Sequence, residues 1–342
     1  METVHTIVVG REAMGCRFEV IFNLLDNSVA TSIGADALNI IEHIEEQLSV
    51  YRPSSEISGI NASTSTRWHN LSADVFDLLL LAKQLHSQTN GTFDVTTGPL
   101  VKAWGFLQKQ GRTPSPEKLA EALACSGMKN IEFHEHEHKI RFQQPDVEIN
   151  LGAIGKGWAI DKAVDHIDME GIENFLIHGG HSSVRSRGTR GFTGQQTECD
   201  GWPVGLRHPL FRDKRIGTIM LQNKALGTSG SGTQFFIEKG QKIGHILDPR
   251  TGQPARGVLS ATVLANTAAE ADALATAAYI LGPQEINRIA PDGSSVAAIL
   301  VVQEEQTNRL TAMLANLDTE EFVPNRATPG LTVIQAKDRG QK

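Results

Sequence analysis

The sequence predicts an α+β fold in which mixed sheets are packed against helices, and three observations support this prediction. Some short stretches alternate apolar and polar residues as strands do, whereas longer stretches repeat apolar residues at helical spacing. The two kinds of stretch do not alternate regularly, as a simple βαβ array would require. The chain has 342 residues, of which 40% are hydrophobic and 21% are charged. It can therefore bury the core of one large domain or two medium ones.

The N-terminal half predicts short strands and amphipathic helices. Residues 18–22 alternate as a strand, and residues 35–48 repeat apolar side chains at helical spacing. Ser72 is placed to cap a helix that runs to about His86, and the Ser115-Pro116 pair opens another helix. The segments predicted next are an extended stretch at 139–142, a glycine-rich turn at 152–157, a helix to about residue 169 and a strand at 174–177.

The C-terminal half predicts strands at residues 204–208, 235–238, 260–265 and 296–302. Between the last two lies a helix with clear end signals. Thr267 and Glu270 have the spacing of a capping box, and the Gly282-Pro283 pair ends the helix. Residues 186–201 are polar and glycine-rich, so we expect a mobile loop there.

Composition and charge exclude several classes of function. The net charge is -7, from 32 Lys and Arg against 39 Asp and Glu, so the chain offers no basic field to nucleic acid. The longest nearly apolar stretches, residues 75–82 and 296–302, fall far short of the roughly 20 residues that a membrane span needs, so we expect no transmembrane segment. The N-terminus lacks a secretory signal, so we expect a cytoplasmic protein unless a leader has been removed. The three cysteines form no CxxC pair or disulfide pattern.

The helix after Thr267 carries a candidate metal site. Asp272 and Thr276 are four residues apart, so their side chains share one face of the helix. A carboxylate and a hydroxyl are hard oxygen ligands of the kind that Mg²⁺ or Ca²⁺ binds. In the alternative interpretation Asp272 complements the helix dipole and Thr276 is a surface residue.

A glycine-rich turn carries a candidate phosphate site. The stretch from Asn150 to Gly157, NLGAIGKG, has the pattern of a strand end, a turn and a helix start. Its glycines would let backbone N–H groups approach a phosphate, and Lys156 adds a positive charge. The stretch matches neither GxGxxG nor GxxxxGK[ST], and the glycines could instead serve only tight packing.

His245 is a candidate base. It opens the stretch HILDPRTG, in which the Asp248 carboxylate could fix the tautomer of the imidazole. A hydrogen-bonded loop histidine is the plain alternative.

Two other patterns carry less weight. The alternating His134, His136 and His138 fit an exposed charged hairpin better than a metal site. The SGSG stretch at residues 229–232 does not satisfy the GxSxG pattern of serine hydrolases.

Taken in order along the chain, these stretches resemble the ApbE family of FAD:protein FMN transferases. The matching motifs, over about residues 14–282, are AMG at 13–15, SVYRPSSEISGIN at 49–61, GTFDVTTGPL at 91–100, WGF at 104–106, the turn at 152–161, HILDPRTG at 245–252 and ADALAT at 271–276. The resemblance implies a single ApbE-like domain over residues 1–342, with the T-fold-related flavin transferase fold.

The resemblance also implies an activity and a set of site residues. In this family FAD lies beside Mg²⁺, and its FMN half is transferred to a Thr or Ser of a partner flavoprotein with release of AMP. His245 would be the catalytic residue. The metal ligands would be Asp272, Thr276 and the backbone carbonyl of Ala153. The residues in contact with FAD would be Met14, Tyr51, Thr92, Phe93, Asp94, Asn150, Lys156 and Ile246.

The chain departs from the family pattern at two places. The family usually has Asp where Asn150 stands, and a motif like NAGGD where residues 177–181 have IHGGH. Family members are also often exported and membrane-anchored. Two alternatives stay open: an FAD pyrophosphatase, in which water replaces the protein hydroxyl and gives FMN and AMP, and a catalytically weak FAD-binding protein. The intact His245 and the Asp272–Thr276 pair argue against a protein that only binds FAD.

Overall fold

The computed structural model describes residues 5–24, 29–63, 66–108, 110–191, 201–211, 213–230, 232, 234–304, 309–318, 321–325, 328 and 330–336. The chain groups into two compact units. Unit 1 contains Met1–Ile44, Lys156–Ser229 and Gly257–Lys342, and unit 2 contains Glu45–Gly155 and Gly230–Arg256. The single domain predicted from the family resemblance stays a prediction.

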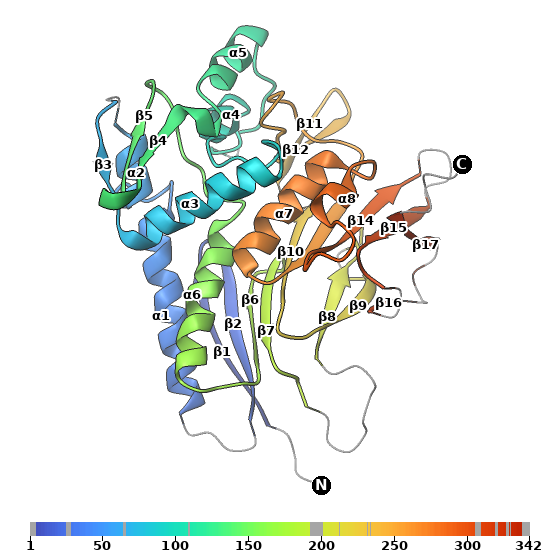
Figure 1. Cartoon of the computed structure of the whole chain (residues 1–342). Coiled ribbons are helices and arrows are strands. Elements are labelled where there is room, and N and C mark those ends of the chain that lie inside the picture. The colour runs from blue at the N-terminus through green and yellow to red at the C-terminus, as the bar shows by residue number, and fades with distance from the viewer. Residues whose placement is uncertain are drawn as a thin grey trace. The chain divides into compact units, whose positions relative to one another are not determined.

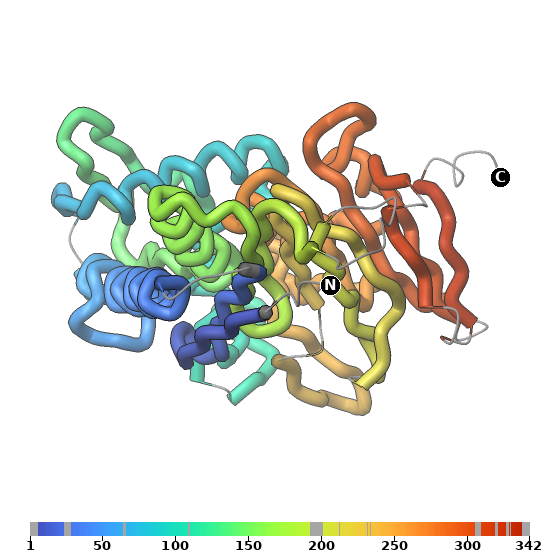
Figure 2. Tube along the Cα trace, turned by 90° about the horizontal axis from the view of Figure 1, so that it is seen from below, coloured from blue at the N-terminus to red at the C-terminus, as the bar shows by residue number. Residues whose placement is uncertain are grey.

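Unit 1 is built on a nine-stranded sheet (Figure 1). Its strands are β1 (His5–Ala13), β2 (Cys16–Leu24), β6 (Phe175–Gly179), β7 (Ser183–Arg187), β10 (Ala225–Gly230), β13 (Ser260–Ala265), β14 (Ala297–Gln303), β15 (Leu310–Ala315) and β17 (Leu331–Gln335). They lie in the order β1-β2-β6-β7-β10-β13-β14-β15-β17, so the first and last strands of the chain form opposite edges (Figure 2). β15 and β17 pair in parallel, whereas β1-β2, β2-β6, β6-β7, β7-β10, β13-β14 and β14-β15 are antiparallel.

Helices cover one face of this sheet. The helices of this layer are α1 (Ala30–Leu48), α6 (Gly155–Met169), α7 (Ala268–Leu281) and α8 (Ile286–Ile289). Phe18, Val20 and Phe22 of β2 alternate toward this face and are fully buried. Gly34 of α1 lies so close to Phe22 that a Cβ there would meet the ring at 2.9 Å. α7 packs on β7, β13 and β14.

The opposite face of the sheet is covered by a small second sheet. Its strands are β8 (Trp202–Arg207), β9 (Arg215–Leu221) and β16 (Phe322–Pro324), in the order β16-β9-β8. Leu176 and Val184 of the large sheet pack there with Trp202, Ile219 and Phe322. Unit 1 is therefore layered as helices, large sheet and small sheet.

Unit 2 combines helices with two small antiparallel sheets. Its regular elements are α2 (Glu56–Asn61), β3 (His69–Asn70), α3 (Ala73–Gln88), α4 (Gly98–Ala103), α5 (Pro116–Ala124), the 3-10 turns η1 (Met128–Asn130) and η2 (Glu135–Glu137), β4 (Ile131–His134), β5 (Lys139–Phe142), β11 (Phe235–Glu238) and β12 (Gln241–Gly244). One sheet has the order β3-β5-β4 and the other is the β11–β12 hairpin. Leu100, Trp104, Phe106 and Leu247 belong to its apolar core.

The structure confirms the elements whose ends carry strong local signals. α7 begins after Thr267, whose hydroxyl accepts a hydrogen bond from the N–H of Glu270 at 3.2 Å, and it ends before Gly282, which has a positive φ of 72°. Ser115 caps α5 through its side chain. Strand 260–265 is β13, and the three alternating histidines lie exposed in the β4–β5 hairpin.

Other predictions need correction or stay open. Ser72 precedes α3 but makes no side-chain cap; its hydroxyl donates to Glu56 at 2.8 Å. The sequence patterns do not indicate strands β1, β3, β7, β9, β10, β12, β15, β16 and β17. The predicted mobile loop begins inside β7, and its residues 192–200 lie outside the described residues. Within the described ranges, no helix is long and apolar enough to span a membrane.

A buried carboxylate fixes the start of α7. Asp161 of α6 accepts hydrogen bonds from the N–H groups of Ala268 at 2.8 Å and Ala269 at 2.9 Å, and it pairs with Arg185 of β7. Burial raises the pKa of Asp161, while the charge of Arg185 and the two amides oppose that rise. One side chain therefore joins α6, α7 and β7.

Asp161→Ala should lower the free energy of unfolding by about 3–5 kcal/mol, because it leaves a buried guanidinium and two helix amides without their acceptor. Asp168→Ala is the matched control, since Asp168 pairs with Arg187 at a partly exposed position and should cost only about 0–1 kcal/mol. Urea denaturation measures both. Equal losses in the two variants would contradict a special role for Asp161.

Candidate functional site

Asp272 and Thr276 lie on the face of α7 that contacts β7 and β10. The Asp272 carboxylate is buried and accepts hydrogen bonds from the Gly157 N–H at 2.9 Å and from the Ser183 hydroxyl at 2.7 and 2.8 Å. The Thr276 hydroxyl is 2.9 Å from the Ser229 hydroxyl. The structure thus brings the carboxylate and the hydroxyl to one face, as their spacing predicts.

The electrostatic setting of Asp272 suits a cation. Burial raises its pKa to about 6, although Lys156, the Ser183 hydroxyl and the Gly157 amide all stabilise the charged form. Within the described part of the chain Asp272 forms no direct ion pair, and a carboxylate removed from water in this way gains from a bound cation. No group of three or more His, Cys, Asp or Glu in the described part of the chain could hold a metal. One carboxylate beside a hydroxyl is instead a donor pair of the kind that Mg²⁺ accepts, because Mg²⁺ keeps several sites for water and phosphate.

The start of α6 places Lys156 near this carboxylate. Lys156 is the second residue of α6, and Gly157, the third, gives its N–H to Asp272. First-turn amides have no partner within their own helix, so this contact satisfies one of them. A Cβ on Gly157 would lie 2.2 Å from the carbonyl oxygen of Ala268. Gly157 therefore serves close helix packing, the alternative interpretation of the glycines, and the charge of Lys156 stabilises the ionised form of Asp272.

Met14 occupies the tip of the β1–β2 hairpin. Met14 and Gly15 both have positive φ, 49° and 72°, between the paired residues Ala13 and Cys16. This is the geometry of a two-residue type I′ turn, whose twist matches that of the strands. The hairpin holds the partly exposed Met14 side chain in a defined position.

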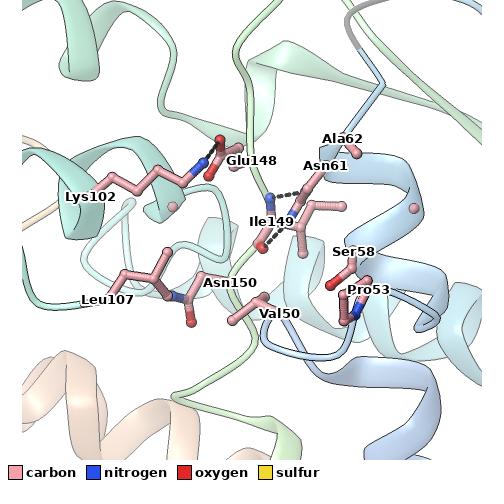
Figure 3. Close-up of a pocket in the computed structure, with 12 residues that line it drawn as sticks. Val50, Pro53, Ser58, Asn61, Ala62, Lys102, Leu107, Glu148, Ile149 and Asn150 are labelled. Atoms are coloured by element: carbon pink, nitrogen blue, oxygen red, sulfur yellow. Dashed lines mark hydrogen bonds and ion pairs between the residues drawn. The ribbon is translucent and has the colours of Figure 1, made fainter. Parts of the chain in front are cut away.

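In unit 2, Asn150 lines a pocket of about 350 Å³ (Figure 3). Its side-chain oxygen accepts from the Gly152 N–H at 2.9 Å, and its own N–H donates to Val95 at 2.7 Å. The segment before Asn150 is held by Asn61, which bonds both the N–H and the carbonyl of Ile149 at 2.8 Å. The residues that line the pocket are Val50, Pro53, Ser58, Gly59, Asn61, Ala62, Gly98, Lys102, Leu107, Glu148, Ile149 and Asn150.

Charged residues line part of the pocket, and an exposed aromatic residue is adjacent to two lining residues in the sequence. Lys102 pairs with Glu148 at its wall (Figure 3). Tyr51 stands between the lining residues Val50 and Pro53 in the sequence and is 72% exposed. An exposed phenol ring offers a flat surface for stacking.

The predicted FAD residues 92–94 have buried side chains. The Thr92 hydroxyl donates to the Thr89 carbonyl at 2.7 Å. Asp94 accepts from the N–H and hydroxyl of Thr96, at 2.7 and 2.6 Å, and lies 3.1 Å from Nδ1 of His86. The hydrogen bond to Asp94 raises the pKa of His86. Thr92, Phe93 and Asp94 therefore stabilise their own loop, and a ligand would meet mainly its backbone.

His245 is oriented by a backbone carbonyl. Its Nδ1 is 3.0 Å from the carbonyl oxygen of Gln234, which can only accept, so Nδ1 carries the proton in the neutral ring. The lone pair of the neutral ring is then on Nε2, as a general base requires. Asp248, suggested as the orienting group, binds Arg250 through two hydrogen bonds of 2.8 and 2.9 Å. Among the described residues, the Gln234 carbonyl is a contact that orients His245.

Ile246 and Ala153 lie in hydrogen-bonded segments of unit 2. Ile246 is buried, and its carbonyl accepts from Ala255 at 2.9 Å. Ala153 is partly exposed in the turn that Gly155 closes with a 2.7 Å hydrogen bond to Leu151.

Sequence reasoning missed Ser183, Ser229 and Gln234. Ser229 lies in the SGSG stretch that was set aside, of which Ser231 lies outside the described residues. Ser183 and Gln234 carry no spacing signal, because each acts on a residue far away in the sequence or through its backbone.

The fold is that of the solved flavin transferases. The ApbE flavin transferase of Vibrio cholerae matches with a TM-score of 0.76 and 24% identity, over 92% of this chain and 98% of that chain. The ApbE protein of Thermotoga maritima matches with a TM-score of 0.78 and 27% identity, over 90% of this chain and 96% of that chain.

The sequence comparisons define the family. The ApbE family model matches residues 14–300. The FAD:protein FMN transferase of Klebsiella pneumoniae is 29% identical over 303 residues, which cover 87% of this chain and 84% of that protein. The enzyme of the same name from Escherichia coli K12 is 28% identical, over 78% of this chain and 73% of that protein. The chain belongs to the ApbE family, and it is a transferase.

Asp272→Asn should change how the stability of the metal-free protein depends on pH. The folded carboxyl has a pKa of about 6 against an ordinary value of 3.8, so folding takes up a proton between these values. The stabilising contribution of this group is complete below the ordinary pKa and is lost as the pH rises through 6, a loss of roughly 3 kcal/mol. Urea denaturation in EDTA should therefore show the variant gaining this amount relative to the wild type between about pH 4 and pH 8. Parallel curves would show that the Asp272 pKa is not raised.

Proposed function

We propose that this chain transfers FMN from FAD to a Thr or Ser hydroxyl of a partner flavoprotein, in a Mg²⁺-dependent reaction that releases AMP. The observation that carries the proposal is the Asp272–Thr276 pair, in which a buried carboxylate with a raised pKa shares a helix face with a hydroxyl. Relatives in the ApbE family are named FAD:protein FMN transferases, which supports this choice of reaction.

The reaction is the displacement of AMP by a hydroxyl. The hydroxyl oxygen attacks the phosphorus on the FMN side of the pyrophosphate, and the bond from that phosphorus to the oxygen of AMP breaks. A Thr or Ser hydroxyl is a weak nucleophile at neutral pH, so Nε2 of His245 takes its proton. The Gln234 carbonyl supports this role because it keeps the other proton on Nδ1.

Charge on the pyrophosphate is balanced by a lysine and a cation. Lys156, at the N-terminal end of α6, stabilises phosphate oxygens with its ammonium group. Asp272, Thr276 and the carbonyl of Ala153 would hold Mg²⁺, which supplies neutralisation of the charge that develops on the pyrophosphate. The bond from Gly157 supports the role of Asp272, since it keeps the carboxylate in one orientation.

The remaining residues bind FAD. The exposed ring of Tyr51 offers a stacking surface, and the pocket lined by Asn150 has room for part of the molecule. Met14, Ile246 and the segment of Thr92, Phe93 and Asp94 complete the proposed contacts. Asn150 keeps the hydrogen bond to Gly152 that a carboxylate would also make, so the neutral amide preserves the turn.

Mass spectrometry of an acceptor peptide tests the function. Incubation with FAD and Mg²⁺ should add FMN to a peptide that carries a target Thr, and should release an equal amount of AMP. EDTA should abolish the transfer, because phosphate charge then stays unbalanced. Free FMN and AMP with unlabelled peptide would indicate a pyrophosphatase instead. Intact FAD that is bound but never cleaved would indicate a binding protein.

His245→Ala should slow the transfer about 10²–10⁴-fold while FAD binding is kept, because the variant lacks the base and not the FAD contacts. His136→Ala is a control, since His136 is an exposed residue of the β4–β5 hairpin. Rates from single-turnover labelling and affinities from flavin fluorescence would be compared. A full rate in His245→Ala with FAD bound would refute the assigned role.

A further inference from the structure

The geometry points to a positioning role for two serine hydroxyls, Ser183 and Ser229, which hold the Asp272 and Thr276 side chains in the orientation that a cation needs. This inference rests on the proposed metal role of Asp272 and Thr276. It adds two residues that the family resemblance does not assign.

Strand register brings the two serines to the same face of the sheet. β7 and β10 are neighbours in the large sheet (Figure 1). In the register of this pair, Ser183 of β7 lies directly opposite Gly227 of β10. Ser229 is two residues beyond Gly227, so it points to the same side of the strand. Ser183, Gly227 and Ser229 therefore form one surface beneath α7.

Gly227 lets α7 come close enough for these hydroxyls to reach it. A Cβ on Gly227 would lie 2.4 Å from the carbonyl carbon and oxygen of Ala271 and 2.6 Å from the nitrogen of Asp272. No other residue has room there, so the helix backbone rests directly on the strand. Short serine side chains on either side can then reach residues of the helix.

Ser183 holds the carboxylate. Its side chain is fully buried, and its hydroxyl oxygen is 2.7 Å from Oδ1 and 2.8 Å from Oδ2 of Asp272. A carboxylate can only accept, so the serine donates. Together with the Gly157 N–H on Oδ2, this bond restrains the carboxylate from two sides and leaves lone pairs for a cation.

Ser229 holds the hydroxyl ligand. Its oxygen is 2.9 Å from that of Thr276, which is also 3.3 Å from the backbone carbonyl of Asp272. The Thr276 proton can therefore be donated to Ser229 or to the helix, and the oxygen lone pairs then remain for the cation. Such outer contacts fix the direction in which a metal ligand points.

Titration with Mn²⁺, followed by the electron paramagnetic resonance signal of the free ion, tests this role without turnover. Ser183→Ala and Ser229→Ala should each raise the dissociation constant for Mn²⁺ about 10–100-fold. Ser229→Thr, which keeps the hydroxyl, should stay near the wild-type value. Ser186→Ala is the matched control: Ser186 is also buried on β7, but its hydroxyl donates to the carbonyl of Leu221 at 3.1 Å. It should lower the melting temperature and leave Mn²⁺ affinity unchanged.

The outcomes separate this inference from the proposed function. Unchanged Mn²⁺ affinity in both alanine variants, with binding still abolished by Asp272→Ala, would overturn the positioning role alone. An equal loss of affinity in Ser186→Ala would also overturn it, because the effect would then come from general destabilisation. Wild-type protein that binds no Mn²⁺, or binds it equally after Asp272→Ala, would overturn the metal site and this inference with it.

Discussion

The close approach of α7 to its neighbours within unit 1 is the constraint on which the candidate metal site depends. Gly157 of α6 and Gly227 of β10 lie so near α7 that any Cβ would meet backbone atoms within 2.2 and 2.4 Å. This packing removes water from Asp272, and the same burial raises the pKa of its carboxyl. The close approach of α7 therefore accounts both for the tight packing of this helix and for the burial of the Asp272 carboxylate.

Asp161 and Asp272 are both buried carboxylates of unit 1, but different groups surround them. Asp161 contacts the full positive charge of Arg185 and two amides at the start of α7, so its charge is locally balanced. Among the described residues, Asp272 receives only an amide and a hydroxyl by direct contact, with Lys156 acting through charge. The first arrangement stabilises the fold, whereas the second leaves room for a cation.

In unit 2, hydrogen bonds within the unit fix the loops that carry the proposed FAD-binding residues. The side chains of Asp94 and Asn61 form hydrogen bonds with backbone and side-chain groups of unit 2, and the Gln234 carbonyl orients His245. Loops held in this way keep their shape before a ligand arrives, which reduces the entropy lost on binding. The exposed Tyr51 ring and the pocket beside Asn150 are presented by such loops.

The sequence by itself determined the elements and motifs whose signals are local. The limits of α7 follow from Thr267 and Gly282, and the order of the motifs indicates the ApbE family because each motif is contiguous. Only the tertiary structure decided that the segment SVRSR is a buried strand, β7. Its polar side chains do not indicate a buried strand in the sequence, because their hydrogen-bond partners are distant in the chain. The pairs are Ser183 with Asp272, Arg185 with Asp161, Ser186 with the Leu221 carbonyl and Arg187 with Asp168. Burial of polar residues depends on partners that no local pattern can contain, and for that reason the surroundings of Asp272 could be seen only in the folded chain.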